Sequence, residues 1–277
     1  MSNYISTRGD SPAIAATEAL FAARAPDGGS YVPQKPPRVL SSGDLATLAW
    51  LSHGRRTAHV FSMFVEEVPI DVFVEAAEQA FGEETLSCKP VWIQLEDDTL
   101  QLIIEHTDAN PEKEGNAIFL QALARLTGKE SGKAIAKDSN NWVYLLVLAA
   151  ALISAYCELV LRRHVPFGQP ADVCLTAHSR AYLPAVYYAK QMGVPFGRIV
   201  CREEGVVQPW KEGIITPAGF SYSERMIFET SGRDSAAVAE LAAVIEKGEI
   251  VPLAGDMQEK LGTFLGTGEP THKILVI

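Results

Sequence analysis

Basic charge and paired cysteines are both scarce in this sequence, and each shortage excludes a class of function. Acidic residues outnumber Lys and Arg by 34 to 24, which gives a formal net charge of −10. A surface of this sign repels nucleic acid and anionic membranes, so the electrostatic footprint of a nucleic-acid-binding protein is missing. The 4 cysteines form no CxxC pair and no His/Cys cluster at zinc spacing, so we expect buried thiols and no metal site.

A targeting signal is also missing, and a single long apolar run stands out. The N-terminus has no basic segment followed by an apolar one, so we expect no signal peptide and a cytoplasmic location. Residues 142–161 carry one charge, Glu158, and are long enough to span a bilayer. That charge, the tyrosine beside it and the lack of a second such run favour the buried central helix of a soluble protein.

Length and composition are those of a globular protein, with 277 residues, 47% of them hydrophobic. Strand 171–176, helix 181–192 and strand 198–202 have the spacing of a right-handed βαβ unit in a parallel sheet. Residues 91–95 and 99–105 flank an acidic turn and predict a hairpin. Periodicity and caps predict further helices over 11–25, 42–51, 56–65, 69–81, 116–126, 141–163, 221–231 and 234–247, and a terminal strand over 273–277.

Short motifs in both halves of the chain resemble the threonine synthase family and occur in the order of that family. They are YISTRG at 4–9, APDGG at 25–29, YVP at 31–33, NNW at 140–142, YYAKQMGVP at 187–195 and FETSGRD at 228–234. The resemblance implies an α/β fold of the tryptophan synthase β-like kind, pyridoxal-phosphate (PLP) fold type II. It implies an N-terminal domain over 1–105 and a parallel-sheet α/β domain over 106–277, reduced by loss of most of the small domain and of the C-terminal part.

The resemblance also nominates a cofactor lysine. The family holds PLP through the lysine of H-G-P-T-x-x-F-K-D, and residues 106–114 keep the histidine and the lysine at the same spacing, as His106 and Lys113. A Schiff-base lysine must lose its proton, whereas the flanking Glu112 and Glu114 favour the ammonium form. A solvated lysine on a polar loop is the alternative interpretation of Lys113.

The resemblance implies that three other parts of the family's cofactor site have no counterpart in this sequence. One is the C-terminal portion, with the residue that faces the pyridine nitrogen in the family. The Ser/Thr/Gly-rich loop of the family is absent from residues 127–140. The glycine-rich phosphate turn aligns with residues 178–182, where both glycines are replaced by residues with side chains, which hinders close approach of the backbone. We therefore expect no cofactor, with PLP as the alternative.

The replaced turn itself suggests an anion site. His178, Ser179 and Arg180 follow the carboxyl end of a predicted strand and precede a predicted helix, where ligands bind in open α/β sheets. Free helix N–H groups, a guanidinium and an imidazole together suit a phosphate or a carboxylate. A helix cap at Ser179 with ion pairs from its two neighbours is the structural alternative.

We therefore expect a threonine-synthase-like protein that has lost PLP catalysis and binds a small anion or a protein partner. Loss of the small domain would uncover apolar surface, which a homodimer would cover. One alternative is a minimal PLP-dependent carbon–oxygen lyase that uses Lys113 on a substrate like O-phosphohomoserine. The other is a purely structural subunit that pairs with another chain.

Overall fold

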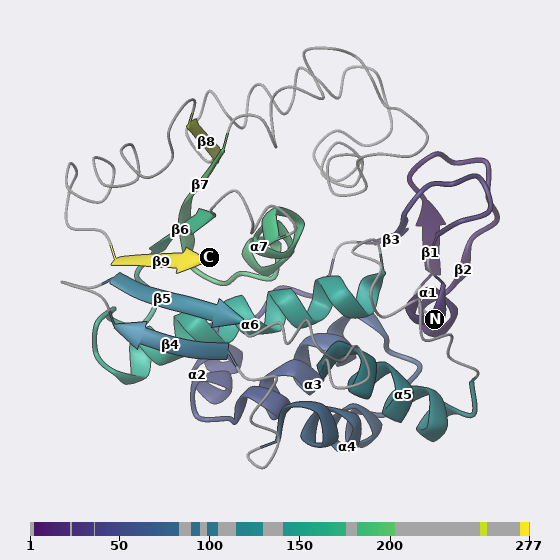
Figure 1. Cartoon of the computed structure of the whole chain (residues 1–277), viewed down its shortest axis with the longest axis horizontal. Coiled ribbons are helices and arrows are strands. Elements are labelled where there is room, and N and C mark those ends of the chain that lie inside the picture. The colour runs from purple at the N-terminus through teal and green to yellow at the C-terminus, as the bar shows by residue number, and fades with distance from the viewer. Residues whose placement is uncertain are drawn as a thin grey trace.

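The chain is built from a small antiparallel sheet, a larger mostly parallel sheet and the helices packed around them (Figure 1). The structure is a computed structural model. It describes residues 3–22, 24–35, 37–82, 90–94, 99–104, 115–129, 141–175, 182–202, 250–253 and 272–276.

The small sheet was not predicted from the sequence. Strands β1 (Asn3–Ser6), β2 (Ile14–Ala15) and β3 (Tyr31–Pro33) pair in the order β2-β1-β3. The helix predicted over 11–25 is wrong in its bounds, because α1 covers only Ala16–Phe21. Ile14 pairs with Tyr4 in the sheet, so the chain is extended where the pattern predicted a helix.

Four amphipathic helices lie below α6 (Trp142–Leu161) in the view of Figure 1, and they confirm the predicted pattern within a few residues. They are α2 (Ser42–Ala49), α3 (His53–Phe64), α4 (Ile70–Phe81) and α5 (Gly115–Thr127). Helix α3 begins earlier than predicted because the Ser52 hydroxyl accepts a hydrogen bond from the N–H of Arg55 (3.3 Å) and caps it. Phe61 joins α3 to its neighbours, with ring centroids 5.7 Å from Phe73 and 4.6 Å from Phe119.

Helix α6 (Trp142–Leu161) forms the centre of the core. By length and composition it is apolar enough to cross a membrane, with a mean hydropathy of 2.2 over its most apolar window. However, 83% of that window is buried inside the protein, and the helix packs against α2, α3, α5 and α7 (Tyr182–Gln191). Its position is that of a core helix, as the sequence predicted.

The larger sheet has the strand order β4-β5-β9-β6-β7-β8, and every neighbouring pair except β4–β5 is parallel. The predicted hairpin, the parallel strands flanking helix α7 and the terminal strand are confirmed. Strand β8 was not predicted from the sequence, since it is short and contains a proline. The helices predicted over 221–231 and 234–247 lie outside the described residues. The bounds are β4 (Pro90–Gln94), β5 (Thr99–Ile104), β6 (Ala171–Leu175), α7 (Tyr182–Gln191), β7 (Phe196–Arg202), β8 (Ile250–Leu253) and β9 (His272–Val276).

Strand β9 lies between β5 and β6 although it comes last in the chain. Its Val276 pairs with Leu102 of β5 on one side and with Leu175 of β6 on the other, so these three residues are level. The five parallel strands therefore end at one edge of the sheet, which we call the carboxyl edge. In Figure 1 the arrows of β5 and β9 point toward the side of the molecule that holds the small sheet and the start of α6.

Candidate ligand site at the carboxyl edge

All five residues that the sequence nominated for a site lie outside the described residues, so their geometry is not part of this structure. They are His106, Lys113, His178, Ser179 and Arg180. The structure does place the points from which their segments leave the sheet. Segment 105–114 follows β5, and segment 176–181 follows β6.

Both segments start at the carboxyl edge. Strands β5 and β6 are separated by β9 alone, so their ends are two strand spacings apart, about 10 Å. The second segment leads directly into α7, which begins at Tyr182 and packs against β6 and β7. The first N–H groups of a helix have no partner within that helix and carry a partial positive charge. This edge therefore holds the starts of both segments, and the second of them precedes a helix in the chain.

The motifs at 4–9 and 25–29, by contrast, form a turn in which their polar groups hydrogen-bond to one another. The Asp27 carboxylate accepts hydrogen bonds from the Ser6 hydroxyl (2.7 Å) and from the N–H groups of Gly29 (2.9 Å) and Asp10 (3.0 Å). The Arg8 guanidinium donates to the Asp27 carbonyl (3.1 Å). A Cβ at Gly29 would overlap the Ser6 hydroxyl, which explains the glycine. The network holds the loop before β3 against the end of β1.

This turn makes acid stability depend on Asp27. Burial raises the pKa of Asp27, but the hydrogen bonds from Gly29, Ser6, Ser11 and Asp10 together hold it below its ordinary value. A carboxyl group with a lowered folded-state pKa contributes stability above its unfolded-state pKa, about 3.9, and loses it as pH falls through the folded-state value. The stabilisation from Asp27 is therefore expected to disappear below about pH 4.

Asp27→Asn is expected to lower the free energy of unfolding by about 1–2 kcal/mol at pH 7, because hydrogen bonds to a charged acceptor are lost. The difference from the natural sequence should shrink as pH falls below about 4. Urea unfolding at several pH values measures both effects. Asp10→Asn, which removes an exposed carboxylate from the same turn, is the control, and an equal pH dependence in both variants would contradict the assignment to Asp27.

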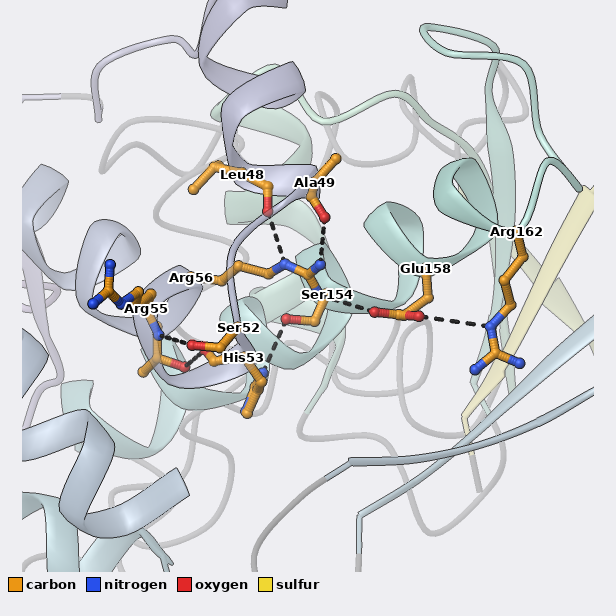
Figure 2. A network of polar contacts seen from close by, with 10 residues as sticks. Leu48, Ala49, Ser52, His53, Arg55, Arg56, Ser154, Glu158 and Arg162 are labelled. Atoms are coloured by element: carbon orange, nitrogen blue, oxygen red, sulfur yellow. Dashed lines mark hydrogen bonds and ion pairs between the residues drawn. The ribbon is translucent and has the colours of Figure 1, made fainter. Parts of the chain in front are cut away.

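A second polar cluster lies in the helical layer and was not singled out from the sequence (Figure 2). The Arg56 side chain is only 3% exposed. Its Nε donates to the carbonyl of Leu48 (2.8 Å) and its Nη2 to that of Ala49 (2.7 Å), the last carbonyls of α2. Its Nη1 pairs with Glu158 of α6 (3.3 Å), which also pairs with Arg162 (3.6 Å).

A histidine–serine pair in the same region does not have the exposure that nucleophilic catalysis needs. His53 Nδ1 and the Ser154 hydroxyl are 2.9 Å apart (Figure 2). Ser154 lies within α6 and is 0% exposed, so its hydroxyl cannot contact a substrate. Burial also raises the pKa of the nearby Cys157 thiol to about 11, so the thiolate is scarce at neutral pH. We assign structural roles to all three side chains.

Metal chemistry finds no support in the part of the chain that the structure describes. No group of three or more His, Cys, Asp or Glu side chains is close enough there to hold an ion. The expectation of scattered, buried thiols agrees with the environment of Cys157.

Sequence comparison matches the first part of the chain to threonine synthases. Residues 3–81 match the family model "Threonine synthase N terminus". Threonine synthase-like 1 of Mus musculus is 41% identical over 64 residues, which are 23% of this chain and 9% of that protein. Threonine synthase of Methylobacillus glycogenes is 35% identical over 68 residues, which are 24% of this chain and 14% of that protein. These matches span only a small part of each relative.

Structural comparison extends the likeness to the whole chain. The PLP-bound threonine synthase from Brucella melitensis superposes with a TM-score of 0.66 at 15% identity, over 100% of this chain and 88% of that one. The threonine synthase from Escherichia coli gives 0.65 at 13% identity, over 99% of this chain and 87% of that one. At such low identity the likeness establishes the fold, and it confirms the predicted fold class. The first part of the chain therefore contains a threonine synthase N-terminal domain, and the chain as a whole has the threonine synthase fold.

Proposed function

We propose that this chain binds a small anion, a phosphate or a carboxylate, at the carboxyl edge through His178, Ser179 and Arg180, and that it has lost PLP catalysis. The observation that carries the proposal is the position of β6 and α7. They flank the segment 176–181 as a strand and a helix of the parallel sheet. Ligands of open α/β sheets bind outside the carboxyl ends of the strands.

The chemistry of this segment favours an anion over a neutral ligand. Arg180 brings a fixed charge and a planar fork that can donate two hydrogen bonds to a phosphate or a carboxylate. Ser179 brings a hydroxyl donor, and His178 adds positive charge below about pH 6.5. The first N–H groups of a helix have no partner within that helix, so the start of α7 favours the same charge.

The donor set fits PLP poorly, although a solved relative is named as PLP-bound. The resemblance offers only Lys113 for the cofactor carbonyl, and two adjacent glutamates favour its charged form over the reactive amine. The turn that would hold the cofactor phosphate has side chains where the family has glycines. We therefore derive no reaction step through this cofactor.

Arg180→Ala is expected to weaken phosphate binding about ten-fold, because a charge-assisted hydrogen bond worth about 1.5–3 kcal/mol is lost. Binding to the natural sequence should tighten as pH falls toward 6. Calorimetric titration with inorganic phosphate and a phosphoamino acid measures both. Arg38→Ala is the control, since the Arg38 side chain is 65% exposed. It lies near the far end of α7, because the N–H of Leu40 donates a hydrogen bond to the carbonyl of Met192. Equal affinities of the Arg180 variant and the natural protein would refute the site.

A minimal PLP-dependent lyase acting on a phosphorylated amino acid remains the second candidate. It is supported by β5, because the segment that contains Lys113 starts where β5 ends, at the same edge as the start of segment 176–181. Adding PLP to the purified protein separates the two functions. A stoichiometric visible absorbance band that disappears in Lys113→Ala would replace the anion-binding proposal with the lyase. The homodimer, the cytoplasmic location and the lack of nucleic-acid or membrane partners stay predictions.

A further inference from the structure

The first turn of α7 has a proline where most helices offer a hydrogen-bond donor. The helix begins at Tyr182, and its third residue, Pro184, has no backbone N–H group. The first N–H groups of a helix are not used inside it, so a proline in this turn costs the helix little. It does remove one donor from the end of the helix that would bind an anion. Pro184 is buried, so packing fixes its position.

The segment before α7 also lacks the residues that let a backbone wrap closely around a phosphate. Phosphate sites at helix starts use several backbone N–H groups, which glycines allow to approach the oxygens. Residues 178–182 have side chains where the resemblance implies two glycines. The same segment carries one permanent positive charge, Arg180. Backbone donors and positive charge are therefore both limited at this point of the chain.

The charge of the neighbouring segment works against a doubly charged ligand. Segment 105–114 starts at the same edge of the sheet, at the end of β5. It contains four acidic residues and a single lysine, and the chain as a whole carries a formal charge of −10. A phosphate ester carries about −1.5 to −2 charges near pH 7, whereas a carboxylate carries one. Repulsion grows with the charge of the ligand, so it is stronger for the phosphate.

We propose that the carboxyl edge selects a small carboxylate over a phosphate. This inference rests on the proposed function, because it takes the same segment as the binding site. The planar fork of Arg180 can donate two parallel hydrogen bonds, which match the two oxygens and the single charge of a carboxylate. A phosphate has further oxygens and further charge, and Pro184 withholds a donor for them. The ligands of this chain are therefore small carboxylic acids rather than phosphate esters.

An NMR titration of the full chain with sodium acetate and with sodium phosphate, at pH 7 and equal ionic strength, tests this selectivity without any variant. The natural protein is expected to bind acetate at least about three-fold more tightly than phosphate. Arg180→Ala should weaken the binding of both anions, because both use the guanidinium. Tighter binding of phosphate than of acetate would overturn the selectivity and leave the anion site standing. Binding of neither anion would refute the proposed function and this inference with it.

Pro184→Ala tests the residue that the selectivity is assigned to. Alanine is a good helix former and restores the N–H group at the third position of α7. The affinity for phosphate should rise about ten-fold, as for one added hydrogen bond to a charged acceptor, and the affinity for acetate should change less than about three-fold. Pro195→Ala, just beyond the other end of α7, is the control and should change neither affinity. An unchanged preference in Pro184→Ala would overturn the role of this proline.

Discussion

Replacement of Arg56 by methionine is expected to lower the free energy of unfolding by about 3–5 kcal/mol, the usual cost of removing one partner of a buried charged cluster. Methionine retains the packing of the side-chain stem but donates no hydrogen bond. The Ala49 carbonyl would then lose its Arg56 donor, while the Leu48 carbonyl would keep the N–H of Leu51 (3.1 Å). Among the contacts of the described residues, the Glu158 carboxylate would keep the longer one with Arg162.

Urea unfolding followed by circular dichroism measures this effect, and the chain offers a matched control. Arg55 precedes Arg56 on the same helix, is 61% exposed and makes a 3.9 Å ion pair with Glu78. Arg55→Met should cost less than about 1 kcal/mol, as exposed ion pairs generally do. Equal losses in the two variants would show that the buried hydrogen bonds to α2 do not stabilise the fold.

Asn141→Ala is expected to cost about 2–4 kcal/mol, because one side chain joins two parts of the fold. Asn141 is 0% exposed, and its Oδ1 caps α6 by accepting from the N–H of Val143 (2.7 Å). Its Nδ2 donates to the carbonyls of Leu20 (2.8 Å) and Ala22 (3.0 Å), at the end of α1.

Asn141→Ser separates the two contributions. A serine hydroxyl can still cap α6, but it cannot reach both carbonyls of the α1 end, so this variant should recover about 1 kcal/mol relative to alanine. The same urea unfolding experiment compares the three proteins. Identical stabilities of the serine and alanine variants would mean that the cap contributes nothing and that the link to α1 dominates.

Local patterns were enough to predict most of the helices. Their apolar spacing lies within single turns, and a cap such as Ser41 acts on an N–H group three residues away. The parallel strands flanking α7 and the hairpin β4–β5 were predicted for the same reason. The family motifs predicted the fold class, because they record the fold of relatives rather than local physics.

Long-range pairing decided what the sequence could not show. Strands β1, β2 and β3 are too short to have a readable alternation, and they form only because they pair with one another. The insertion of β9 between β5 and β6 depends on pairing across most of the chain. That insertion is what brings the starts of segments 105–114 and 176–181 to within two strand spacings of each other.

The sequence by itself determined that this chain is an acidic α/β protein with threonine-synthase-like motifs, a central apolar helix and candidate site residues after two strands. Only the tertiary structure decided which charged side chains are buried. Arg55 and Arg56 are adjacent and chemically identical, as are Glu66 and Glu67, so composition cannot tell them apart. The packing of α2 and α6 around α3 buries the Arg56 guanidinium, and the folded turn between α3 and α4 buries the Glu67 carboxylate, because burial depends on neighbours that are distant in the sequence.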